Sequence, residues 1–137
     1  MPENDPRDLP GFRKKSFALP YAGGEIWFEH LDGIYGYTSL VLEKLAGDIP
    51  QFVRPSAPAN ICVMLDETDI TEELIGALVE ALTMHGKRFM RAAFVGVDKR
   101  DRRAKKELTK RLYGRGFAIA FISDTEKAKE WLISEEN

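Results

Sequence analysis

Apolar residues in the first third of the chain follow a two-residue period, which predicts strands. The runs 14–19 and 25–31 have the length and composition of strands, and residues 20–24 between them have the proline and glycines of a turn. Alternate positions of a strand face opposite sides of its sheet. The second run therefore has two faces, one with Ile26, Phe28 and His30 and the other with Trp27, Glu29 and Leu31.

From residue 38 onwards, helical spacing alternates with short apolar runs. Apolar residues three or four positions apart predict helices over 38–53, 71–86, 98–113 and 125–133, and Pro50 is expected to kink or end the first. Short apolar runs predict strands over 61–65, 89–97 and 117–122. Strands that alternate with helices favour right-handed crossovers and parallel pairing. The sequence therefore predicts one α/β domain, with a mixed sheet of about four to five strands and about four helices.

The end of the chain has a specific local pattern. The apolar run 117–122 leads to Asp124 and Thr125, which are good N-cap residues of a helix. The apolar residues that follow form one stripe, made of Ala128, Trp131 and Leu132. We expect this closing helix to dock through the stripe, with the ring of Trp131 buried.

Length and composition limit the class of protein. The 137 residues are enough for one domain, 44% of them are hydrophobic, and the formal net charge of −2 argues against a dedicated nucleic-acid binder. The single cysteine, Cys62, excludes an internal disulfide framework and is expected to be buried in a strand. No apolar run approaches the roughly 18 residues that span a bilayer.

The acidic, proline-rich residues 1–12 have little apolar surface to bury. We therefore expect a flexible leader over 1–12 and a folded domain over 13–137. The leader lacks the apolar core of a signal peptide, which makes a cytoplasmic protein the default expectation.

Four different segments follow one another along the chain in an order that is informative. They are Ile26-Trp-Phe-Glu-His-Leu-Asp-Gly33; Val63-Met-Leu-Asp66 with a loop before a helix that opens at Thr71; Arg91-Ala-Ala-Phe-Val-Gly-Val-Asp98 before a charged helix; and the closing pattern of Phe121 followed by Glu126-x-Ala-x-x-Trp-Leu132. In this order they resemble the STAS domain, and more narrowly its SpoIIAA-like (anti-sigma-factor antagonist-like) group. The match covers roughly residues 14–135.

The resemblance implies a domain of sheet and helices that binds partners and does not catalyse a reaction. Bacterial members act as anti-sigma-factor antagonists, or as regulatory modules of transporters and signalling assemblies. Regulatory members carry Asp-Ser-Ser-Gly, in which the second serine is phosphorylated at a helix N-terminus. The corresponding residues here are Asp69-Ile70-Thr71-Glu72, which keep the aspartate and a hydroxyl but lack the first serine and the glycine. The implied partner is a regulatory kinase, an anti-sigma factor or a signalling complex.

The loop after the third predicted strand contains the candidate site residues Asp66, Asp69, Thr71 and Glu72. A phosphate on Thr71 would meet the free N–H groups of a helix start, although Glu72 and Glu73 would repel it. The alternative role is helix capping, because Asp69 and Glu72 have capping-box spacing and Thr71 can cap in another register. Asp66, Glu67 and Asp69 could also hold a hard divalent ion, but solvated loop carboxylates are the simpler interpretation.

No other pattern predicts a catalytic, metal or cofactor site. Neither His30 nor His85 has a partner at the spacing of a triad or a zinc site. The basic residues of the helix over 99–111 could dock on phosphates or an acidic partner, and a solvated helix face is the simpler interpretation.

These observations predict a non-enzymatic regulatory protein-interaction domain that uses no cofactor and reads no specific nucleic acid. The oligomeric state is left open, with a dimer as one option. The alternative is a carrier of an apolar or acyl ligand, with Trp27, Phe28, Phe52 and Phe94 around the ligand. A third hypothesis is an enzyme whose site the sequence does not reveal.

Overall fold

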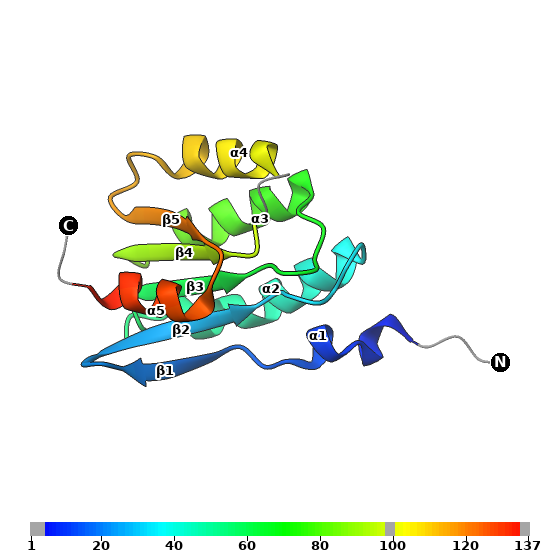
Figure 1. The fold of residues 1–137 in the computed structure, drawn as a ribbon, viewed down its shortest axis with the longest axis horizontal. Coiled ribbons are helices and arrows are strands. Elements are labelled where there is room, and N and C mark those ends of the chain that lie inside the picture. The colour runs from blue at the N-terminus through cyan, green and yellow to red at the C-terminus, as the bar shows by residue number, and fades with distance from the viewer. Residues whose placement is uncertain (1–4, 98–100, 135–137) are drawn as a thin grey trace.

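Five strands form one mixed sheet in the computed structural model, which describes residues 5–97 and 101–134 (Figure 1). The strands lie in the order of the chain: β1 (Phe17–Tyr21), β2 (Gly24–His30), β3 (Asn60–Met64), β4 (Arg91–Val95) and β5 (Ala118–Ile122). β1 and β2 pair antiparallel as a hairpin, and each later pair is parallel. This arrangement confirms the predicted α/β class and the predicted mixed sheet.

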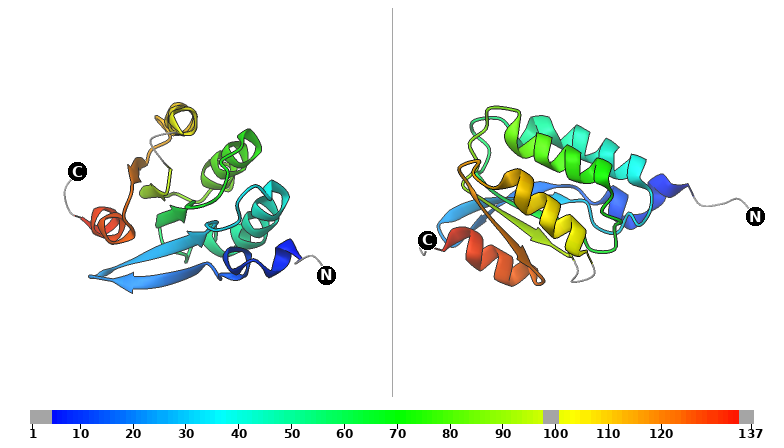
Figure 2. Two further views of the ribbon diagram at one scale, coloured as in Figure 1. Left: turned by 45° about the vertical axis from the view of Figure 1, so that its right-hand side comes forward. Right: turned by 90° about the horizontal axis from the view of Figure 1, so that it is seen from above.

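Helices cover the two faces of this sheet unequally (Figure 2). α2 (Thr38–Phe52), α3 (Glu72–Thr83) and α4 (Arg102–Leu112) lie on one face, and α5 (Thr125–Ile133) lies on the other. The three helices share a face because successive right-handed crossovers advance in one direction across the sheet. Two short helical segments, η1 (Pro6–Asp8) and α1 (Pro10–Arg13), precede the hairpin. None of the helices in the described ranges has the length and apolar character needed to cross a bilayer.

The two faces of β2 contribute to separate layers of the core, as the alternation in the sequence predicts. Trp27 and Leu31 pack with the layer under α2, α3 and α4, whereas Ile26 and Phe28 pack with the layer under α5. Cys62 is buried in the second layer, which confirms its predicted position. Burial raises the pKa of the Cys62 thiol to about 12, so this cysteine is an unreactive part of the core.

Pro20 and Pro50 lie inside regular elements. Pro20, which the sequence assigns to a turn, lies in β1. β1 is an edge strand, where a missing backbone N–H is tolerated. The turn itself is made by Ala22 and Gly23, whose φ angles are 44° and 89°. Pro50 lies in the last turn of α2, which ends two residues later at Phe52, as expected.

The closing helix docks on the sheet as predicted, except at its tryptophan. Ala128 and Leu132 are buried, but Trp131 is only half-buried. Its ring lies at the rim of the layer, where the Arg91 guanidinium is 5.5 Å from the ring centroid. The prediction of a buried ring is wrong. Ala128 and Leu132 lie at the centre of the apolar stripe and meet the sheet, whereas Trp131 lies at the border of the stripe.

The first described residues contact the loop after β2. Gly11 is buried, and a Cβ atom at this position would be 2.3 Å from the carbonyl oxygen of Asp32. The side chain of Phe12 packs against the core layer under α2. Residues 1–4 of the predicted leader lie outside the described residues, and the flexibility of residues 1–12 in solution stays a prediction.

Replacing Gly11 with alanine is expected to detach residues 5–13 from the domain. The added Cβ atom would overlap backbone atoms of both Asp32 and Gly33, and the loop that contains them is held by further hydrogen bonds. Hydrogen exchange at the Lys14 amide, which closes the last turn of the segment, should become faster. The measurement is amide exchange followed by NMR or mass spectrometry.

Gly47→Ala in α2 is the matched control. Nothing lies within 4 Å of a Cβ atom at Gly47, so alanine should stabilise the helix by about 0.5–1 kcal/mol. Unchanged exchange at Lys14 in Gly11→Ala would show that the segment does not dock in solution.

Candidate functional site

Two loops at the carboxyl end of the sheet are joined as if they extended β2 and β3. The N–H of Gly33 donates to the carbonyl of Asp66 at 2.7 Å, and the N–H of Tyr35 donates to the carbonyl of Glu67 at 2.8 Å. The N–H of Asp69 donates back to the carbonyl of Tyr35, also at 2.8 Å. These bonds attach the loop that contains the predicted site residues to the loop that follows β2.

Neighbouring segments hold the second loop in place. The hydroxyl of Thr68 is buried, donates to the carbonyl of Leu31 at 2.6 Å and accepts from the N–H of Ile34 at 3.0 Å. On the other side, Gly96 approaches so closely that a Cβ atom there would be 2.5 Å from the backbone nitrogen of Asp66. The loop therefore has a fixed backbone, although it lies at the surface.

Acidic and aromatic side chains project from these loops. We name Tyr35, Tyr37, Asp66, Glu67 and Asp69 the acidic–tyrosine surface, and all five residues are exposed. The two tyrosines are 51% and 46% exposed, which is high for large aromatic residues. The Tyr35 hydroxyl donates to Glu67 Oε2 at 2.9 Å, and this bond raises the pKa of Tyr35. Such a surface suits a protein segment with basic side chains, because tyrosine is enriched at interfaces and opposite charges guide association.

The other two predicted site residues lie beside this surface, at the start of α3. Thr71 is the N-cap of the helix, since its Oγ1 accepts a hydrogen bond from the N–H of Leu74 at 3.2 Å. This is one of the two capping registers that the sequence allows. Glu72 is exposed and forms an ion pair with Arg103 of α4.

The carboxylates of the loop do not form a metal site. Among residues 5–97 and 101–134, no three histidine, cysteine, aspartate or glutamate side chains form a group that could hold a metal ion. Burial raises the pKa of Asp66, and the negative charges of Asp32 and Glu67 raise it further. The acids therefore repel one another, and a cationic group of a partner would relieve that repulsion.

A Lys–Asp–His cluster next to this surface was not predicted. Oδ1 of Asp32 is 2.9 Å from Nδ1 of His30, and Oδ2 accepts from Nζ of Lys14 at 2.7 Å. Burial opposes ionisation of Asp32, but the contacts with His30 and Lys14 outweigh it and lower the pKa of Asp32 to about 2. The two-residue spacing of His30 and Asp32 is a signal that could have identified this pair, whereas Lys14 comes from a separate segment.

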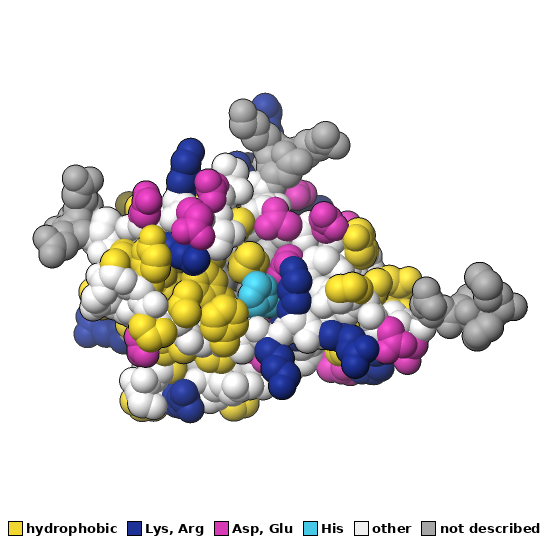
Figure 3. Space-filling model, turned by 60° about the horizontal axis from the view of Figure 1, so that its bottom comes forward, with side chains coloured by type: hydrophobic (Ala, Val, Ile, Leu, Met, Phe, Trp, Pro, Cys, Tyr) yellow, Lys and Arg dark blue, Asp and Glu magenta, His cyan; other side chains and the backbone are white. Residues whose placement is uncertain are grey.

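Figure 3 shows a histidine at the border of an apolar area of the surface, and the ring of His30 lies against such an apolar side chain. The ring of Phe17, which is 42% exposed, stacks on His30 with 5.8 Å between ring centroids. Within the described residues, no serine, threonine or cysteine side chain hydrogen-bonds to the His30 ring. The cluster therefore orients a histidine near the surface, and lacks the nucleophile of a Ser–His–Asp triad.

A second polar cluster is buried between the sheet and α2. Glu29 has no exposed surface, and its Oε1 accepts from Nε1 of Trp27 at 3.0 Å. Its Oε2 has no partner among the described residues. Two causes raise the pKa of Glu29 well above its ordinary value. Burial is the larger, and the neighbouring carboxyl group of Asp48 is the next. A raised pKa favours the protonated form of this buried carboxyl group, and no local sequence pattern indicates such a group.

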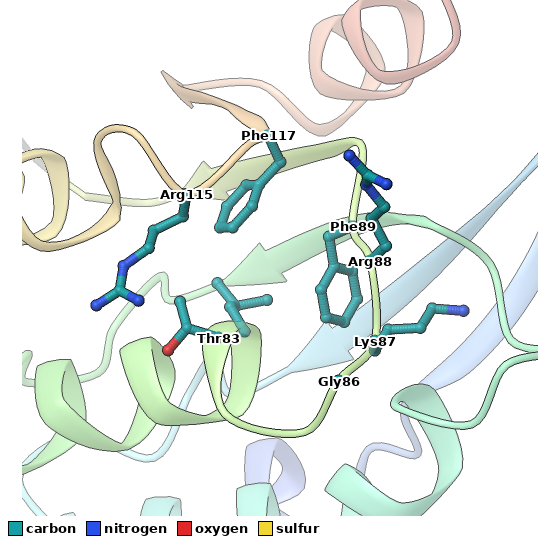
Figure 4. Close-up of a pocket in the computed structure, with 8 residues that line it drawn as sticks. Thr83, Gly86, Lys87, Arg88, Phe89, Arg115 and Phe117 are labelled. Atoms are coloured by element: carbon teal, nitrogen blue, oxygen red, sulfur yellow. The ribbon is translucent and has the colours of Figure 1, made fainter.

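A hollow at the amino end of β4 and β5 has basic residues that do not converge (Figure 4). The rings of Phe89 and Phe117 meet edge to face, with 6.5 Å between their centroids. Lys87 extends away from these rings, and its Nζ donates to the carbonyl of Arg54 at 3.1 Å. Arg115 extends in the opposite direction. Because the charges diverge, this hollow of about 280 Å³ is a weaker candidate than the acidic–tyrosine surface.

No family model, no curated protein and no solved structure matches this chain. The function is therefore inferred from the geometry of its surfaces. Among the described residues, the acidic–tyrosine surface combines exposure, charge and a fixed backbone, and the residues singled out from the sequence lie in it or beside it.

Proposed function

We propose that this chain is a non-enzymatic regulatory domain that binds a protein partner through the acidic–tyrosine surface. The observation that carries the proposal is the backbone pairing of the two loops, which holds Tyr35, Glu67 and Asp69 in an exposed arrangement. A surface that is ordered before binding loses little conformational entropy when the partner docks. Buried tyrosines often contribute much of the binding energy of an interface, and the acids would select a basic contact segment.

The proposal includes the STAS-like, SpoIIAA-like assignment of the domain. The antiparallel hairpin, the parallel strands that follow it and the closing helix are compatible with that fold. The loop after β3 corresponds, in the resemblance, to the regulatory loop of the family. Thr71 is then the position at which a phosphate would alter binding, because it would add charge beside Asp69. A regulatory kinase, an anti-sigma factor or a cytoplasmic signalling complex with a basic contact segment is the proposed class of partner.

The carrier alternative has weaker support. The four side chains assigned to a ligand cavity are between 0% and 3% exposed and pack in the core. Trp27 and Phe52 have ring centroids 5.9 Å apart, and Phe94 stacks on Phe121 at 5.5 Å. An apolar ligand in this space would have to displace packed rings, and protein interiors resist such changes because they are close-packed.

The test of the proposed function is capture of a partner from the source cell by the purified domain, followed by titration. Glu67→Lys combined with Asp69→Lys should weaken binding of the captured protein by at least about tenfold, since two attractive charges become repulsive. The matched control is Glu25→Lys with Glu130→Lys, which makes the same change in charge at exposed positions on β2 and α5.

The control variant should bind the partner as the wild type does, and circular dichroism should show that both variants are folded. Equal loss of binding in the two variants would show that the interaction depends on the overall charge of the domain and not on this surface. Binding at wild-type affinity by both variants would show that the acidic–tyrosine surface does not bind the partner.

A further inference from the structure

The outer edge of β5 presents unpaired backbone groups. β5 pairs with β4 on one side and ends the sheet on the other. The N–H of Ala118 donates to the carbonyl of Met90 at 3.0 Å, which sets the direction of the peptide groups along the strand. Successive residues of a strand turn these groups to opposite sides, so the N–H and C=O groups of Ile119 and Phe121 point outward. Within the described ranges, none of these four groups hydrogen-bonds to another residue.

Helix α4, which is rich in lysine and arginine, lies beside β5 (Figure 1). Nζ of Lys105 lies 5.9 Å from the centroid of the Phe121 ring, which identifies the side of α4 that faces β5. Another side of the helix faces α3, where Arg103 forms its ion pair. The helical period places Arg102, three residues earlier, on the side of Lys105, whereas Lys106 lies about 100° away from Lys105 around the helix axis. The edge of the sheet is therefore accompanied by a row of positive charge.

Two open hollows lie near the two ends of β5. The first, of about 640 Å³, has a mainly apolar lining that includes Met90, Leu112, Tyr113, Phe117 and Ile119. Met90 and Tyr113 are 64% and 86% exposed, so large apolar surfaces face solvent here. The second hollow, of about 600 Å³, is bordered by Lys105, Phe121 and Ile122. The first hollow lies at the amino end of β5 and the second at its carboxyl end, so an extended chain laid along β5 would run from one toward the other.

We propose that β5 is a docking strand, to which an extended acidic segment of a partner protein adds as a further strand. Main-chain hydrogen bonds to Ile119 and Phe121 supply the pairing, and the basic side of α4 selects acidic side chains. A second copy of this chain is not the occupant, because antiparallel pairing of two β5 edges would bring two basic α4 helices together. The proposal rests on β5 and α4, and it holds whether or not the acidic–tyrosine surface binds a partner.

The two faces of β5 define the sequence of the added segment. Ile119 and Phe121 face the core layer under α4, and Ile122 faces the layer under α5. An added strand continues the same alternation, so its acidic residues belong on the α4 side and its apolar residues on the other. Asp66 and Glu67 also line the second hollow and would repel acidic residues of the segment, so these residues belong beside Lys105.

The probe is a short peptide of alternating glutamate and valine, acetylated and amidated at its ends. We expect it to shift the amide resonances of Ile119 and Phe121 and to slow their hydrogen exchange. Arg102→Gln with Lys105→Gln should weaken binding by about tenfold. The matched control, Lys110→Gln with Arg111→Gln, removes the same charge from other sides of α4 and should bind within about twofold of the wild type.

Two N-methylated peptides separate strand addition from charge attraction. Only every second N–H of an added strand points toward its neighbour. Methylation of the valine nitrogens in one peptide, and of the glutamate nitrogens in the other, should abolish binding of one peptide and spare the other. Equal behaviour of the two methylated peptides overturns the proposal. Equal weakening by the two double variants also overturns it, because α4 would then be a general anion-binding face that also accepts nucleic acid or a membrane.

Discussion

Replacing Gly96 with alanine is expected to lower the free energy of unfolding by more than about 3 kcal/mol. Gly96 has a φ of 87°, and a Cβ atom there would be 2.5 Å from the backbone nitrogen of Asp66 and 2.7 Å from its Cγ. The backbone of Asp66 cannot move away freely, because its carbonyl accepts the N–H of Gly33. Chemical denaturation of the variant measures this loss.

Gly86→Ala separates the two causes of the expected loss, which are the strain of a positive φ angle and the overlap of the Cβ atom with Asp66. Gly86 also has a positive φ, 73°, but nothing lies within 4 Å of a Cβ atom there. Alanine at Gly86 should therefore cost only the conformational strain, about 1–2 kcal/mol. Similar losses in the two variants would show that the close approach of Gly96 to Asp66 does not constrain the loop.

Stability is expected to fall as the pH rises from about 5 to about 9, because the folded protein holds a proton on Glu29. Burial, and then the neighbouring Asp48, raises the pKa of Glu29 from 4.5 to about 9. Between these values the folded state binds a proton that the unfolded state releases. The stabilising contribution is complete below pH 4.5 and is lost as the pH rises through 9, with a slope of up to about 1.4 kcal/mol per pH unit.

Glu29→Gln should remove this slope, because an amide keeps an acceptor for the Trp27 N–H and does not ionise in this range. Glu25→Gln, at an exposed position of the same strand, is the control and should keep the wild-type dependence. Denaturation midpoints measured from pH 5 to pH 9 provide the comparison. A wild-type curve that is flat, or parallel to that of Glu29→Gln, would show that Glu29 is ionised in the fold.

The elements of the fold could be predicted because apolar periodicity is a local property of the chain. The alternation in β2 correctly separated residues that pack under α2 from those that pack under α5. The predictions failed where a residue's place depends on whether its element lies at the edge or in the middle of the sheet. Pro20 is tolerated in β1 because that strand is an edge, and Trp131 is half-exposed because it lies at the rim of the sheet.

The candidate site could be predicted only in part. Asp66 and Asp69 stood out because they follow a buried strand, and Thr71 because it opens a helix. Their tyrosine neighbours belong to another loop, which is joined to theirs by bonds such as that between Ile34 and Thr68, 34 residues apart. A local pattern does not state which distant loops meet. Contacts of this kind also create the Lys–Asp–His cluster and place Asp48 of α2 near the buried Glu29.

The most direct test of the proposed function is hydrogen–deuterium exchange of the domain, free and in complex with its captured partner. Binding through the acidic–tyrosine surface predicts slower exchange in residues 33–37 and 66–73, with no change in α5. Protection confined to other segments, with none in these two loops, would contradict the claim that this surface binds the partner.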